Sequence, residues 1–264
     1  MNNYKVFLKK ELVESLKTFK LLIMGGIFLL LGMMGPLMAK YTPEILKWAI
    51  ESDPSLAGMN LSAMIAQPTA FESWSQFYSN VGQLGYIALV VLFSGMLSSE
   101  ISRGALKIML SKGLSRSAVV LSKFTSSVLV WTGSFCLSAL VSLGLTSYLF
   151  DDGVSALFFT LFCLWVFGVL LLALTTLMAA LTNRSFVCMF AVGGVVVVMS
   201  LVELLHFIKE YVPMALISTS RMLLINGMEP GEFVPALVTA GVLVVVFILL
   251  AVWIFGKKSG IRDS

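Results

Sequence analysis

Charge is scarce in this 264-residue chain: Lys, Arg, Asp and Glu supply only 12% of the residues, whereas 58% are hydrophobic. Charged residues make up about a quarter of an ordinary soluble domain. The apolar runs behind this imbalance leave no segment large enough for a separate soluble domain. The composition therefore excludes an ordinary soluble globular protein, and we expect an all-α, polytopic membrane protein in which residues 1–264 form a single transmembrane domain.

Residues for catalysis are missing as well. The chain has one histidine, His206, so a metal site with two histidines at His-Glu-x-x-His spacing is impossible. Neither the Gly-x-Ser-x-Gly sequence of serine hydrolases nor the Gly-x-x-x-x-Gly-Lys-Ser/Thr phosphate loop occurs. The three cysteines, Cys136, Cys163 and Cys188, stand in apolar runs without pairing or metal-binding spacing. We therefore expect no catalytic residue, no metal site and no cofactor bound by this chain.

The centres of the apolar runs lack charge, because all 18 basic and 14 acidic side chains fall in predicted loops or at run ends. A carrier driven by an ion gradient normally holds carboxylates or basic groups near the middle of the membrane, so this pattern argues against such a carrier. If the chain takes part in transport, its energy must come from another polypeptide. Small residues such as Ser138, Ser142, Gly193 and Gly194 are expected to mark close helix packing rather than a substrate path.

Six apolar runs are long enough to cross about 30 Å of hydrocarbon as helices. They cover residues 21–38, 81–98, 126–150, 155–181, 186–205 and 235–255. Gly35-Pro36 is expected to end the first run, Ser155 and Ser185 to cap the fourth and fifth, and Pro235 to lie in the first turn of the sixth.

Residues 1–20 precede the first run and have an amphipathic pattern. Apolar side chains recur at helical spacing, and lysines and glutamates fill most of the positions between them. This pattern predicts an interfacial helix that lies against membrane lipid. A cleavable signal peptide is the alternative, but a long and partly acidic charged segment makes a poor start for one, so we expect the helix to be retained.

The distribution of Lys and Arg predicts the orientation. With the N-terminus in the cytoplasm, fourteen of the eighteen basic residues fall on the cytoplasmic side. Most acidic residues fall on the other side. The net charge of +4 therefore reflects an asymmetry across the membrane, and it gives no reason to expect a nucleic-acid partner. We expect both termini to be cytoplasmic.

The first external segment, residues 39–80, is longer than a simple connection requires. It contains a predicted short helix over residues 43–51 and a middle part punctuated by proline and glycine. Its aromatic residues are expected to belong to the interfacial belt of the membrane. They are Phe71, Trp74, Phe77 and Tyr78.

The second external segment, residues 203–234, is too apolar for a solvated loop and too interrupted to span the membrane. Pro213 and Asn226-Gly227 divide it, which predicts two partly inserted helices. Irregular backbone at membrane depth is tolerated only against protein or a water-filled cavity, so we expect this re-entrant segment to line or close a space on the outer side. The candidate gate residues are Phe207, Tyr211, Pro213 and Met214.

A charged segment, residues 99–123, separates the second and third runs. Placing each of its charges in hydrocarbon would cost about 2.5 kcal/mol or more, so this segment must lie outside the bilayer. Apolar residues between the charges predict a short helix within a cytoplasmic loop. The charged residues are Glu100, Arg103, Lys107, Lys112, Arg116 and Lys123.

This loop carries the most specific motif of the chain. It reads Glu100-x-x-x-Gly104-Ala-Leu-Lys-Ile-Met-Leu-Ser111-Lys-Gly-Leu-Ser115-Arg116, with Lys123 further on. The motif, the six spans and the Lys-rich leader resemble the permease subunits of bacterial ATP-binding-cassette exporters of the second type, the ABC-2-like family. Ala105 stands where that family usually has threonine, and Gly113 where it often has proline.

The resemblance implies a coupling helix in the loop that docks on a separate ATPase subunit, which binds ATP and Mg. By this resemblance Glu100 and Arg103 would make polar contacts with the ATPase. The remaining residues of the coupling set are Gly104 in the same motif, Leu106, Met109 and Leu110 as groove-filling side chains, and Lys107 and Arg116 as orienting charges. It also implies a bacterial cell-membrane location.

The resemblance further implies a transport pathway shared by two permease copies or homologues. The route would run between the second and fifth spans of each copy, with residues 203–234 as the external gate. The expected substrate is an amphipathic peptide or another hydrophobic compound. Two alternatives stay open: a non-transporting membrane anchor or sensor that recruits a cytoplasmic partner, and a loop that is only a basic connector lying on anionic lipid.

Overall fold

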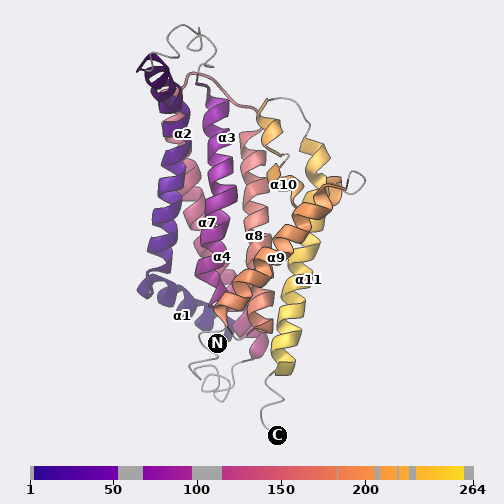
Figure 1. Ribbon diagram of the computed structural model, residues 1–264. Coiled ribbons are helices and arrows are strands. Elements are labelled where there is room, and N and C mark those ends of the chain that lie inside the picture. The colour runs from indigo at the N-terminus through magenta and orange to yellow at the C-terminus, as the bar shows by residue number, and fades with distance from the viewer. Residues whose placement is uncertain are drawn as a thin grey trace.

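The computed structural model describes residues 3–52, 68–96, 115–182, 184–205, 209–218, 220–225 and 230–258. Within these ranges the regular elements are helices, and none is a strand. Six helical segments are long and apolar enough to cross a membrane (Figure 1). For the described residues, the prediction of an all-α protein with six helices of sufficient length and hydropathy to span a membrane is therefore confirmed.

The helices lie mostly side by side, and the leader lies across one end of the bundle (Figure 1). The leader is α1 (Asn3–Lys17), and the first span is α2 (Lys20–Ser52). The second span consists of α3 (Ala70–Asn80), a π-helical segment η2 (Val81–Gly85) and α4 (Tyr86–Ser94). The remaining spans are α7 (Arg116–Leu149), α8 (Leu157–Leu181), α9 (Ser185–Glu203) and α11 (Val234–Lys258).

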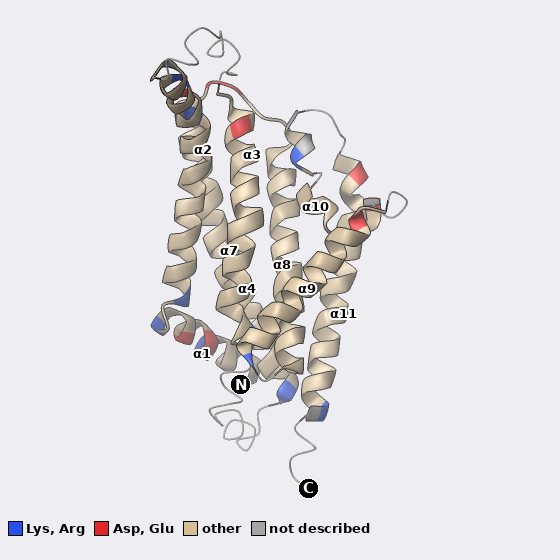
Figure 2. Ribbon diagram, viewed as in Figure 1, with Lys and Arg blue, Asp and Glu red and all other residues tan. Residues whose placement is uncertain are grey.

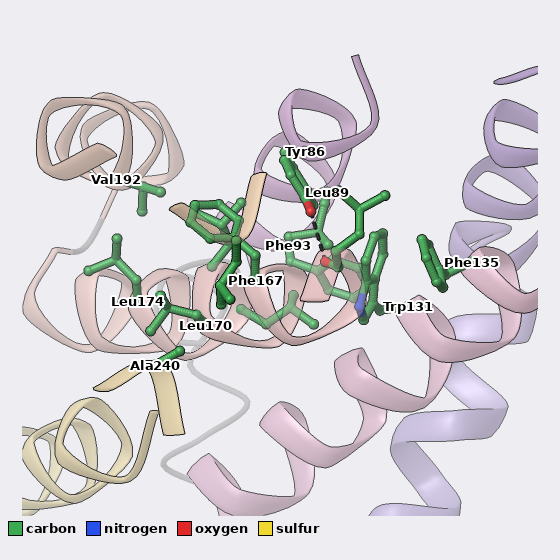
Figure 3. Close-up of a cluster of buried hydrophobic side chains, with 14 of the residues drawn as sticks. Tyr86, Leu89, Phe93, Trp131, Phe135, Phe167, Leu170, Leu174, Val192 and Ala240 are labelled. Atoms are coloured by element: carbon green, nitrogen blue, oxygen red, sulfur yellow. Dashed lines mark hydrogen bonds between the residues drawn. The ribbon is translucent and has the colours of Figure 1, made fainter. Parts of the chain in front are cut away.

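The core of the bundle surrounds α8, whose side chains are buried along most of its length. Figure 3 shows α8 residues between side chains from the second span, α7, α9 and α11. Gly168 in α8 allows this packing, because a Cβ there would lie 2.3 Å from Cζ2 of Trp131. The indole of Trp131 in turn donates to the carbonyl oxygen of Trp165 at 3.2 Å. A small residue at this position therefore sets how closely α7 approaches α8.

Small residues also set the contact between α2 and α7. A Cβ on Gly32 would lie 2.5 Å from the carbonyl oxygen of Ser138. Ser138 and Ser142 are fully buried, so the prediction that they mark close helix packing is confirmed. The same prediction is wrong for Gly193 and Gly194, because a Cβ at either position would meet nothing within 4 Å in the described structure.

The first helix does not end at Gly35-Pro36 as predicted. It continues through Pro36 and Pro43 to Ser52, so the predicted helix over residues 43–51 is its continuation. Proline is tolerated inside membrane helices when neighbouring structure compensates. Here Pro36 is buried, and α3 packs so closely that a Cβ on Gly35 would lie 3.0 Å from the carbonyl oxygen of Ser73.

The second span begins at Ala70 instead of Val81. Thr69 caps it through a reciprocal pair of hydrogen bonds with Glu72. Trp74, Phe77 and Tyr78 are consequently buried in the bundle, so the interpretation of these aromatic residues as an interfacial belt is wrong. The sequence pattern missed this start because polar residues dilute the hydropathy of residues 70–80.

Three other span ends also differ from the prediction. Neither Ser155 nor Ser185 caps a helix: Ala156, in a left-handed conformation with φ 51°, precedes α8, and Arg184 precedes α9. The third span begins ten residues before the predicted Ser126, since Ser115 caps α7 by accepting a hydrogen bond from the Ala118 amide. The end of the predicted cytoplasmic loop, residues 116–123, is therefore helical. Pro235 lies in the first turn of α11, as predicted.

Candidate functional site

A groove of about 690 Å³ lies between the second and fifth spans. The central helix α8 contributes Phe167 and Leu171 to its wall, and the short helix α10 (Ala215–Ser218), with the residue before it, contributes Ile217 and Met214. The second span provides Gly82, Gln83, Tyr86, Ile87, Val90 and Val91, and α9 provides Met189, Phe190, Val192, Gly193, Gly194 and Val196.

The arrangement of α9 explains why space remains here. This helix crosses the bundle obliquely (Figure 1), and only Cys188 and Val192 on it are buried. Val192 points toward the α8 residues Leu170 and Leu174 (Figure 3), whereas Phe190 is 72% exposed. Gly193 and Gly194 present no side chain to fill the gap. The fifth span therefore contacts the bundle along a narrow line and leaves a groove beside it.

The groove wall is almost entirely apolar, and none of its lining residues is charged. The hydroxyl of Tyr86 is already used, because it donates to the carbonyl oxygen of Leu164 at 2.8 Å. Gln83 is the other lining side chain with a hydrogen-bonding group. Such a groove suits an apolar or amphipathic molecule and offers nothing to hold an ion.

The described part of residues 203–234 forms four short helices, where the sequence predicted two partly inserted helices. They are η3 (Lys209–Tyr211), α10, η4 (Ser220–Ile225) and η5 (Pro230–Phe233). Leu216, Leu223 and Leu224 are buried, so this segment packs into the protein instead of forming a solvated loop.

The four candidate gate residues have different positions. Met214 lines the groove, and Pro213 beside it is buried. Tyr211 is 56% exposed, and Phe207 lies outside the described residues. Ile217, which the sequence did not single out, also borders the groove; a Cβ on Gly82 would lie 3.4 Å from its Cγ2 atom. The short helix α10 therefore contacts the second span at the edge of the groove.

Most of the predicted ATPase-coupling residues fall outside the described part of the chain. They are Glu100, Arg103, Gly104, Leu106, Lys107, Met109 and Leu110. Arg116 is described: it is the first residue of α7, and its Nη1 atom donates to the carbonyl oxygen of Gly256 at 2.6 Å. Gly256 lies in the last turn of α11, where carbonyl groups lack helical partners and a cation is favourable.

The sequence did not reveal a buried ion pair at the same end of the bundle. Lys123 in α7 is 4% exposed and Glu11 in the leader 7% exposed, and Nζ of Lys123 lies 3.2 and 3.1 Å from the two carboxylate oxygens. One signal was available, because Phe7, Glu11 and Ser15 recur every four residues and so share a helix face. That face packs on α7.

Two further hydrogen bonds extend this contact. The hydroxyl of Tyr4 donates to Oγ1 of Thr125 at 2.9 Å, and the hydroxyls of Ser15 and Ser126 are 3.5 Å apart. The chain turns sharply between α1 and α2, where Phe19 adopts a left-handed conformation with φ 57°. Such a backbone is uncommon for a bulky residue. The leader is thus attached covalently to the first span but packed along the third.

Glu14, also in the leader, has a perturbed acidity. Burial alone would raise the pKa of its carboxyl, but a hydrogen bond and charge from Lys10, with weaker contributions from Lys123 and Lys20, hold the pKa below its ordinary value of 4.5. The Lys10 and Glu14 side chains form an ion pair at 2.9 Å, four residues apart on one helix. Glu14 therefore keeps its negative charge at neutral pH.

Lys and Arg are concentrated at the end of the bundle that holds α1 and the last turn of α11 (Figure 2). The described acidic residues at the starts of α3 and α11 lie at the opposite end (Figure 2). Together with the six apolar spans, this arrangement defines a multi-pass helical membrane protein. Comparisons with models of known protein families and with curated proteins find no match to the chain.

Proposed function

We propose that the protein is the transmembrane permease subunit of an ATP-driven exporter, coupled to a separate ATPase through residues 100–116. The observation that carries this proposal is the uncharged groove of about 690 Å³ between the second and fifth spans, bordered by α10. The resemblance implies a substrate path between these two spans. An amphipathic peptide or another hydrophobic compound matches the apolar wall of this groove.

In this proposal the chain supplies the path and its partner supplies the energy. ATP and Mg bind the partner ATPase, and two permease copies or homologues face each other across the path. Both termini are cytoplasmic in a bacterial cell membrane, so the basic end of the bundle faces the ATPase. None of the described residues that line the groove is an acidic or basic side chain that could couple transport to an ion gradient, which supports an external energy source.

The contacts around the start of α7 suggest how movement of the loop would reach the spans. Arg116 contacts the end of α11, and Lys123 contacts the leader. A displacement of the loop that precedes α7 would therefore act on the first, third and sixth spans together.

Purification of the full-length protein with the proteins encoded beside it tests the proposal. An ATPase subunit should co-purify in equal amounts, and Arg103→Glu and Met109→Asp should abolish both this association and transport while membrane insertion stays normal. Lys40→Glu reverses a charge predicted on the opposite face and serves as the matched control. Normal coupling in both loop variants would refute the proposal; an associated protein without transport would favour the anchor or sensor.

A further inference from the structure

Four uncharged polar side chains form a strip along one side of the second span. Ser79, Asn80 and Gln83 follow Gln76 by three, four and seven residues. This spacing places the four side chains on neighbouring turns of one helix face. We call this set the amide strip. It lies within the membrane-spanning segment Ala70–Ser94, and its last member, Gln83, lines the groove.

The polar groups of the amide strip are only partly satisfied by one another. The amide nitrogen of Gln76 donates to Oδ1 of Asn80 at 3.5 Å, and that of Gln83 donates to Oγ of Ser79 at 3.2 Å. A primary amide has two donors and a carbonyl oxygen, so each glutamine keeps hydrogen-bonding capacity for another molecule. Asn80 is 9% exposed, and its Nδ2 atom has no hydrogen-bond partner in the described structure.

The position of the strip is costly if it faces lipid. Gln76 and Gln83 are exposed on the surface of a membrane span, and an unpaired amide in hydrocarbon costs several kcal/mol by rough estimate. Polar residues inside membranes generally face a water-filled space or mark a substrate path. Gln83 also lies within the π-helical segment Val81–Gly85, and such segments occur frequently at functional sites.

We propose that the amide strip binds the backbone of an uncharged stretch of an amphipathic peptide, whose apolar side chains occupy the adjoining groove. This inference rests on the proposed export function and specifies its substrate class.

The repeat of the strip favours a peptide over a lipid chain. Gln76 and Gln83 are separated by about 10 Å along the helix at 1.5 Å per residue, with the half-buried Ser79 between them and the buried Asn80 behind. A peptide backbone offers a donor and an acceptor at every residue and can pair with such a series, whereas an acyl chain offers none. A charged ligand group would find no opposite charge among the residues that line the groove.

Binding to the full-length protein in phosphatidylcholine nanodiscs tests the inference with three probes. The first is a short dansyl-labelled peptide of leucine and serine with blocked ends, and the second is the same peptide methylated on its backbone nitrogens. The third is a dansyl-labelled alkyl chain. Wild-type protein should bind the unmodified peptide about tenfold more tightly than the methylated one, the factor expected for one hydrogen bond of ordinary strength.

The variants Gln83→Leu and Gln76→Leu should reduce or remove this preference, while binding of the alkyl probe should stay unchanged. Thr239→Val, which removes a polar group from α11 away from the groove, is the matched control and should keep the preference. Equal binding of the two peptides to wild-type protein would overturn the inference, as would an unchanged preference in both glutamine variants.

A second copy of the chain could cover the strip instead. In that case the Gln83→Cys variant should resist a membrane-impermeant maleimide even without peptide, and this result would also overturn the inference. None of these failures would affect co-purification of the ATPase, so they are distinguishable from failure of the export proposal.

Discussion

The ion pair between Glu11 and Lys123 gives the sharpest test of how the leader is held. Both side chains are buried, and both carboxylate oxygens lie within 3.2 Å of the ammonium nitrogen. Removing one partner leaves an uncompensated buried charge, which typically costs about 3–5 kcal/mol. Lys10 also lies 3.2 Å from Glu11, so Glu11 keeps one neighbouring cation when Lys123 is removed. We therefore expect Lys123→Met and Glu11→Leu each to destabilise the protein by up to about this amount, because each removes the buried ion pair that joins the leader to α7.

The double variant Glu11→Leu/Lys123→Met should recover most of this loss, since replacing a buried ion pair by apolar residues is often neutral or stabilising. Glu14→Gln is the matched control on the same helix. Its carboxylate is about two-fifths exposed, so its ion pair is worth at most about 1 kcal/mol.

Two measurements on the purified protein in mild detergent report these differences: the midpoint of thermal denaturation and the rate at which a protease cleaves the leader. The leader should become cleavable in both single variants and stay protected in the double variant. Two results would refute the reasoning: single variants no less stable than the Glu14→Gln control, or a double variant as unstable as the sum of the singles.

Three further predictions concern packing, pH and the groove. Gly32→Ala should destabilise the protein by about 1–3 kcal/mol, because the new Cβ would lie 2.5 Å from the Ser138 carbonyl oxygen. Gly26→Ala is the control, because a Cβ there meets nothing within 4 Å and should not destabilise the protein. Thermal denaturation of both variants checks this difference. The pKa of Glu14 is lowered in the folded protein, so its stabilisation is present above its ordinary value of 4.5 and lost as the pH falls through the folded pKa. The difference in melting temperature between wild type and Glu14→Gln should accordingly disappear in acid, and a difference that grows in acid would contradict the assigned sign. Gly194→Trp should fill the groove and block substrate-stimulated ATP hydrolysis in the complex with little change in stability, and unchanged stimulation would place the substrate path elsewhere.

The start of the second span decides which polar side chains lie beside the groove. The predicted span from Val81 to Ser98 contained no strongly polar side chain except Gln83. The observed span begins at Ala70 and thereby brings Gln76, Ser79 and Asn80 to membrane depth. A shift of one helix boundary thus converts residues of a presumed loop into the polar edge of a candidate substrate site.

The number of spans, their helical form and the unequal distribution of charge were determined by the sequence alone. Each depends on a local quantity, the free energy of transferring a window of side chains into hydrocarbon, and that quantity can be summed along the chain without knowing which helices are neighbours. The packing of Ser138 was predictable for a similar reason, because small residues at helical spacing favour close contact wherever their partner lies.

Only the tertiary structure decided the features that depend on neighbours. Pro36 continues a helix because α3 packs beside it, Trp74 is buried because its helix is capped at Thr69, and Lys123 finds Glu11 across more than one hundred intervening residues. The groove exists because α9 contacts the bundle through few side chains, Val192 among them. Which helices become neighbours depends on small free-energy differences between many possible helix contacts. A linear pattern of apolar and polar residues does not specify these differences.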